Sequence, residues 1–149
     1  MDLNFGKKYK DFTKEVKDFC KKYKGIHFID SSKVPLSGSF KSGEIKMTRS
    51  DWQKILIEKG YFARSIPSEY GGYGGESDII KSRIIAEEFA KSKIPPPMGG
   101  QGIDMLVPTL LELGTEEQKQ KYIKPTLHGE IIWCQGYSCL LYTSDAADE

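Results

Sequence analysis

The chain has 149 residues, enough for one domain with a buried core. Hydrophobic residues make up 38% and charged residues 29%, and the formal net charge is +1, so bulk electrostatics gives no reason to expect a nucleic-acid partner. No apolar run approaches membrane-spanning length, and the first residues lack the basic-then-apolar order of a signal peptide.

Apolar residues recur every three or four positions over residues 5–24, which predicts a first helix with one buried stripe. Residues 25–48, rich in serine and glycine, are predicted to form a long surface connection. A second helix is predicted to begin at a capping box, with the Ser50 hydroxyl at the cap and the Gln53 amide three residues later. Residues 61–75 hold too many glycines for regular structure and predict an exposed turn.

A third helix is predicted over residues 77–92, where three prolines then follow. A fourth covers residues 103–113, and Pro108 should kink it or split it into two short pieces. Residues 115–118 have capping-box order and open a fifth helix over residues 116–127. About five helices without an alternating strand pattern predict an all-α, bundle-like domain.

Residues 129–138, which follow the last helix, read Gly-Glu-Ile-Ile-Trp-Cys-Gln-Gly-Tyr-Ser. The apolar start predicts a chain entering a buried strand or a ligand-lining turn. Gly136 would let the backbone come close to a flat ligand, because it has no side chain. Gln135 and Ser138 can both donate and accept hydrogen bonds, which suits a heteroaromatic ring. An ordinary buried strand ending in a turn is the alternative, since short apolar runs are ambiguous.

The rest of the chain offers no obvious acid, base or nucleophile, so no catalytic residue is nominated. His27 is placed in a loop and His128 at a helix end, and both are predicted to have capping or surface roles. The three cysteines are irregularly spaced and fit neither a zinc site nor a disulfide framework. No metal site is therefore expected, and reduced thiols in a cytoplasmic protein are the simplest account.

Four motifs, taken together, resemble the N-terminal helical domain of the acyl-CoA dehydrogenase family. They are Pro-Ser-Glu-Tyr-Gly-Gly at 67–72, Pro-Thr-Leu-Leu at 108–111, Gly-Thr-Glu-Glu-Gln-Lys at 114–119 and the stretch 129–138. Their order and spacing fit that domain across nearly all of residues 5–138. The resemblance implies an α domain at residues 1–128 and, at 129–138, the first strand of a middle β-barrel domain. In the family a C-terminal four-helix domain then follows, and FAD lies between the domains.

The resemblance also implies which residues contact the cofactor. Gln135, Gly136, Tyr137 and Ser138 correspond to residues that run along the flavin, with the Ser138 hydroxyl near N5. A donor there would stabilise the charge that develops as hydride arrives. The implied partners are an acyl-CoA substrate and an electron-transfer acceptor, and the complete protein is expected to be a homo-oligomer.

The family pattern breaks after Ser138, where Glu-Pro is expected. Residues 139–149 instead look like a translated sequencing adapter and are excluded as non-native. Ser144 and Asp145 fall on the family's Ser-Asp by chance alignment. The family's catalytic glutamate comes from the C-terminal domain, so this polypeptide is expected to be an inactive fragment. An acyl-CoA oxidase would share the same N-terminal pattern. A stand-alone helical interaction module without a cofactor is the competing hypothesis.

Overall fold

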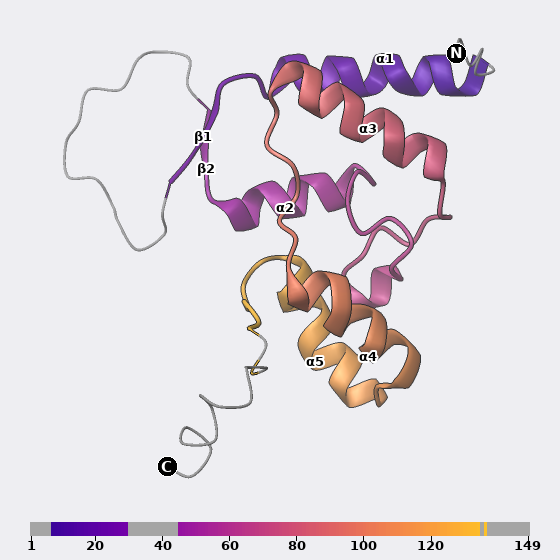
Figure 1. Ribbon diagram of the computed structural model, residues 1–149, viewed down its shortest axis with the longest axis vertical. Coiled ribbons are helices and arrows are strands. Elements are labelled where there is room, and N and C mark those ends of the chain that lie inside the picture. Colours follow the sequence, from indigo (N-terminus) through magenta and orange to yellow (C-terminus); the bar gives the residue numbers. More distant parts are fainter. Residues whose placement is uncertain (1–6, 30–44, 135, 137–149) are drawn as a thin grey trace, which may run out of the picture.

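The computed structural model describes residues 7–29, 45–134 and 136, and these are mainly helical (Figure 1). The five α-helices are α1 (Lys7–Lys22), α2 (Arg49–Glu58), α3 (Ile79–Ser92), α4 (Val107–Leu113) and α5 (Glu116–Leu127). The other described elements are the strands β1 (Ile26–Phe28) and β2 (Ile45–Met47), a 3-10 turn η1 (Ser68–Tyr70) and a π-helical turn η2 (Gly102–Leu106). The predicted all-α class is confirmed. None of the helices in these ranges has the length and apolar character needed to cross a bilayer.

The first hydrophobic core joins α1, α2 and α3, and α1 and α3 lie side by side at the top of Figure 1. The stripe predicted for the first helix forms part of it, since Phe12, Val16 and Phe19 are buried. The Phe19 ring stacks on Trp52 of α2, with centroids 5.7 Å apart, and on Phe89 of α3 at 6.0 Å. Such aromatic pairs add about 0.5–1.5 kcal/mol each beyond the area they bury. Phe19 thereby binds all three helices into one core.

The second core lies between α4, α5, η1 and the end of α2, which contributes Ile57. Val107 of α4 and both Ile123 and Leu127 of α5 are buried in it. Tyr70 of η1 is buried too, and its hydroxyl donates a 2.7 Å hydrogen bond to the Glu116 carboxylate at the start of α5. This bond raises the pKa of Tyr70 to about 12 and lowers the pKa of Glu116 below its usual value. The glycine-rich turn is therefore fastened to the beginning of α5.

Gln53 of α2 connects the two cores. Its side chain is fully buried, and its Nε2 donates to the Leu127 carbonyl at 3.1 Å. Its Oε1 accepts from the backbone N–H of Met98 at 2.8 Å. The neighbouring Trp52 donates from its indole nitrogen to the Pro95 carbonyl at 3.1 Å. Because a buried amide must have partners, these bonds hold α5 and the segment before η2 against α2.

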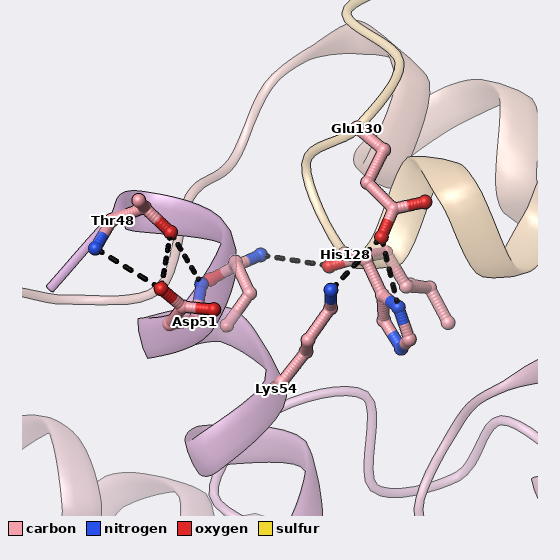
Figure 2. Close-up of polar contacts among 7 residues, drawn as sticks. Thr48, Asp51, Lys54, His128 and Glu130 are labelled. Carbon is pink, nitrogen blue, oxygen red and sulfur yellow. Dashed lines mark hydrogen bonds and ion pairs between the residues drawn. The ribbon is translucent and has the colours of Figure 1, made fainter. Parts of the chain in front are cut away.

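The start of α2 differs from its prediction. The N-cap is Thr48 rather than Ser50, and the Thr48 hydroxyl accepts the N–H of Asp51 at 3.0 Å. The Asp51 carboxylate accepts the N–H of Thr48 at 3.3 Å, which completes the box (Figure 2). Hydrogen bonds from Thr48 lower the pKa of Asp51. The prediction was wrong because the carboxylate of Asp51, not the amide of Gln53, completes the capping box. The Gln53 side chain is buried in the core instead.

The predictions for the last two helices are confirmed. Pro108 is the second residue of α4, and η2 precedes it, so the apolar run is split into two pieces. Proline has no N–H to donate to the preceding turn, which favours this break. The fifth helix has its predicted bounds, and its capping box pairs the Thr115 hydroxyl with the Gln118 N–H at 3.3 Å.

Three short elements were not predicted. Residues 25–48 contain β1 and β2, which pair in parallel with Phe28 opposite Met47, so His27 lies in a strand rather than in a loop. Residues 61–75 contain η1. Three residues are too few to show an alternating or helical period, so the local pattern does not reveal such elements.

We predict that Gln53→Leu lowers the free energy of unfolding by about 2–4 kcal/mol. The substitution keeps the side chain's approximate volume but leaves the Met98 N–H and the Leu127 carbonyl without their partner, and each buried unpaired group costs about 1–3 kcal/mol. Urea denaturation at low protein concentration measures the change. Gln120→Leu, at an exposed position of α5, is the control and should change stability by less than about 0.5 kcal/mol. Equal effects of the two variants would contradict the bridging role of Gln53.

Candidate functional site

The predicted flavin-contacting residues lie beyond α5, and the structure describes one of them. Gly136 is exposed, and a Cβ atom placed on it would meet no atom within 4 Å. Gln135, Tyr137 and Ser138 lie outside the described residues. The space beside the Gly136 backbone is therefore empty of described atoms, which suits the approach of a flat ligand. Residues 129–134, which lead into this stretch, are placed and show how it is held.

The prediction of a buried strand is wrong for the described part of this stretch. Residues 129–134 form no strand, and Ile132 is 84% exposed. Exposure alternates, with Ile131 and Trp133 half-buried and Ile132 and Cys134 exposed. A strand needs a neighbouring strand for its backbone groups, and the described residues provide none at this position. The stretch therefore has one face on the helical domain and one face turned away from it.

The turn after α5 forms the first attachment of this segment. His128 is the C-cap of the helix, as predicted, and its backbone N–H donates to the Lys124 carbonyl. Gly129 has a φ of +68°, the left-handed conformation that favours glycine at a helix end. A Cβ atom on Gly129 would lie 3.0 Å from the sulfur of Met98. Glycine at position 129 therefore allows both the positive φ and the close contact with Met98.

Glu130 forms the second attachment, through an ion pair with α2. Its Oε1 lies 3.0 Å from Lys54 Nζ and 3.6 Å from His128 Nδ1 (Figure 2). The bond from Lys54 is the main reason that the pKa of Glu130 lies below its usual value. Burial lowers the pKa of His128, although the nearby Glu130 carboxylate acts in the opposite direction. The histidine is therefore neutral at pH 7 and accompanies an ion pair rather than supplying its charge.

Trp133 forms the third attachment. Its indole Nε1 donates a 2.8 Å hydrogen bond to the Thr126 hydroxyl, and its ring meets Tyr122 edge to face at 5.7 Å between centroids. The ring also lies against Gly102 of η2, where a Cβ atom would be only 2.4 Å from Trp133 Cδ1. The absence of a side chain at Gly102 is therefore what allows the indole to lie there.

Two hollows adjoin the segment. The smaller hollow, of about 100 Å³, is lined by Trp133, by Gly102 and Ile103 of η2, and by residues near them in the chain. It is too small to enclose a cofactor alone, because ligand pockets usually measure about 300–1,000 Å³. The larger, about 520 Å³, lies between Arg49 at the start of α2 and Ile132. Met98 and Gly129 line both hollows, which are therefore neighbours along one face of the domain.

The described residues contain no group of three or more His, Cys, Asp or Glu side chains that could hold a metal ion. Cys20 is buried and Cys134 exposed, and both are free thiols. Sequence reasoning missed the contribution of Gly102, whose only signal was its place among clustered glycines. It also missed the pairing of Lys54 with Glu130, since nothing in either local pattern indicates a partner so distant in the chain.

Residues 7–130 match the family model described as "Acyl-CoA dehydrogenase, N-terminal domain". The chain therefore belongs to the acyl-CoA dehydrogenase family, and the described helices are its N-terminal domain. The matched region ends at Glu130, within the segment that the three attachments hold.

Several curated relatives carry related names. The acyl-CoA dehydrogenase IpdE1 of Mycolicibacterium smegmatis is 32% identical over 103 residues, which cover 69% of this chain and 26% of the relative. The glutaryl-CoA dehydrogenase of Desulfococcus multivorans is 27% identical over a region that covers 89% of this chain and 32% of the relative's length. The caffeyl-CoA reductase-Etf complex subunit CarC of Acetobacterium woodii is 31% identical over 86% of this chain and 31% of its own. The chain thus spans less than a third of the length of each. No solved structure matches it.

We predict that stability falls as the pH drops from 7.5 to 5. Because the folded state lowers the pKa of His128, the unfolded chain binds a proton first, and stability is lost as the pH falls below the usual histidine value of 6.5. The Glu130 contribution is present above the usual glutamate value of 4.5 and is lost below it. Thermal melts across this range should show a smaller loss for His128→Gln. The control is His27→Gln, at an exposed position of β1. Because His128 is intact in this variant, its stability should still fall with pH by the amount that His128 contributes. An unchanged slope in His128→Gln would contradict this account.

Proposed function

We propose that this chain is the N-terminal domain of an FAD-dependent acyl-CoA dehydrogenase, which removes hydrogen from the α and β carbons of an acyl-CoA thioester. The observation that carries the proposal is the family match over residues 7–130. The match ends at Glu130, and the resemblance implies that the segment after it leads to the flavin. The relatives whose names contain acyl-CoA dehydrogenase support the same reaction class.

The described residues fit a flavin as far as they reach. The exposed Gly136 backbone can lie against a flat ring, and the segment before it is held at three points. When bound, FAD supplies the hydride acceptor, at its N5 position. The protein's part at this edge is to bind and orient the ring. Ser138, and with it Gln135 and Tyr137, would provide polar groups along the ring's edge, with the Ser138 hydroxyl donating near N5.

The other functional groups are proposed to lie in the remainder of a longer protein. The catalytic glutamate belongs to the family's C-terminal domain, so we expect the 149-residue chain to be inactive by itself. The substrate would be an acyl-CoA and the acceptor an electron-transfer protein, which accords with the Etf complex in the name of one relative. Two relatives are named as reductases, 3-(aryl)acrylate reductase and caffeyl-CoA reductase, so reduction of an α,β-double bond is the second candidate direction.

The test compares the 149-residue chain with the longer protein encoded by the source gene. The longer protein is expected to be yellow, with flavin absorbance at about 450 nm, and either to form or to reduce the α,β-double bond of an acyl-CoA. Ser138→Ala should lower kcat by about a hundredfold, the typical cost of one preorganised donor. Ser65→Ala, at an exposed position, is the matched control and should leave kcat unchanged. A colourless longer protein would support the interaction-module hypothesis instead.

A second prediction concerns the surface of the 149-residue chain. Ile79 of α3, Met105 of η2, Leu113 of α4 and Ile132 are all exposed, at 84%, 56%, 78% and 84%. Further domains of the family would cover part of this surface, and without them it should promote association. We expect the chain to bind a hydrophobic dye and to associate at high concentration. The longer protein should bind less dye per molecule. A monomeric chain without dye binding would contradict this expectation.

A further inference from the structure

Trp133, Thr126 and Tyr122, which precede the predicted flavin contacts in the sequence, form a chain of hydrogen bonds. The Thr126 hydroxyl donates to the Tyr122 carbonyl one helical turn earlier, at 2.6 Å. The same oxygen accepts the indole N–H of Trp133 at 2.8 Å. Because the hydroxyl proton is committed to Tyr122, its lone pairs are available to the indole, and one orientation of the Thr126 side chain serves both bonds. Thr126 is only 2% exposed, so water does not readily replace either partner.

Gly102 completes this arrangement from the opposite side. A Cβ atom there would lie 2.4 Å from the Trp133 ring and 3.0 Å from Thr126 Cγ2. The indole is therefore held between the backbone of η2 and the side of α5. Backbone groups and a buried hydroxyl make this a rigid attachment, unlike the half-exposed ion pair of Lys54 and Glu130.

Trp133 is the last of the three attachments before the predicted site. Only Cys134 and Gln135 separate it from Gly136, so a shift of the indole moves the origin of the flavin-contacting stretch. A burial requirement alone would be met by any apolar side chain. The hydrogen bond from the Trp133 indole to the Thr126 hydroxyl also fixes the orientation of the ring, because hydrogen bonds are directional and apolar packing is not.

We propose that Trp133 and Thr126 are positioning residues that set where the flavin-contacting stretch leaves the helical domain, with Gly102 as the space that receives the indole. The inference rests on the proposed function. These residues do not touch the reacting atoms. They act through the backbone of the following residues, which would align the polar groups of that stretch with the edge of the ring.

The first experiment tests the attachment without the cofactor. Thr126→Val, Trp133→Phe and the double variant are made in the 149-residue chain, and their melting temperatures are measured by circular dichroism. Both single variants break the same bond, so the double variant should lose clearly less than the sum of the two single losses. Thr126→Ser keeps the hydroxyl and should retain most of the stability. Fully additive losses would overturn the proposed hydrogen bond.

The second experiment measures flavin binding in the longer protein. Thr126→Val should weaken FAD binding by about fivefold to tenfold, the equivalent of one hydrogen bond, and should shift the visible flavin bands. Thr126→Ser should restore both properties. Gly102→Ala should act in the same direction as Thr126→Val. Gly99→Ala is its control, because a Cβ atom there meets its nearest neighbour at an ordinary 3.6 Å.

The outcomes separate this inference from the function on which it rests. A wild-type longer protein without flavin would overturn both. A flavin-bound wild type with unchanged FAD affinity and spectrum in Thr126→Val would overturn the positioning role alone, even if that variant were less stable. Weaker binding and shifted bands, restored by serine, would support the inference.

Discussion

The side chain of Gln53 forms two hydrogen bonds on which the arrangement of the helices depends. It is fully buried, and its partners are backbone groups of Leu127 and Met98. Either group would be costly to bury alone, so the amide determines which segments can lie against α2. The same two segments form the frame of the candidate site, since one leads into η2 and the other ends where residues 129–134 begin. The core contact and the site therefore share one support.

Attachment of the segment after α5 follows from this arrangement. Once α5 is placed, Glu130 comes within reach of Lys54, and Trp133 comes against the backbone of Gly102. These contacts differ in chemistry, because one is a half-exposed ion pair and the other a half-buried indole whose donor bonds the buried Thr126 hydroxyl. Exposed ion pairs typically contribute about 0–1 kcal/mol, so the indole is the stronger constraint on position. Function at this site would depend more on packing than on charge.

The five helices could be predicted because long apolar stripes and caps are local signals. Phe12, Val16 and Phe19 lie in the core as their spacing indicates. Local signals fail where tertiary contacts decide. Gln53 looked like a capping residue because its type and position fit a box, while the core needed its amide. The parallel pair β1 and β2 leaves no period in strands of only three residues.

The candidate site was less accessible to such reasoning. Residue types at 135–138 indicated only a flat heteroaromatic ligand, and FAD itself came from the resemblance. Of these four residues the structure describes Gly136 alone. The Trp133 attachment needs Gly102 and Thr126, which are distant from each other in sequence and unremarkable in their local patterns. Residue types show what a site can bind, whereas the fold decides which backbone leaves room for a particular ring.

The alternating exposure of residues 131–134 limits how the length of this segment can vary. Inserting or deleting a single residue between Gly129 and Trp133 would exchange the two faces, turning the indole outward and Cys134 inward. Inserting or deleting two residues would leave each side chain on the same face, but it would move the Trp133 indole away from Gly102. Among related chains, the spacing from the end of α5 to this tryptophan should therefore stay constant.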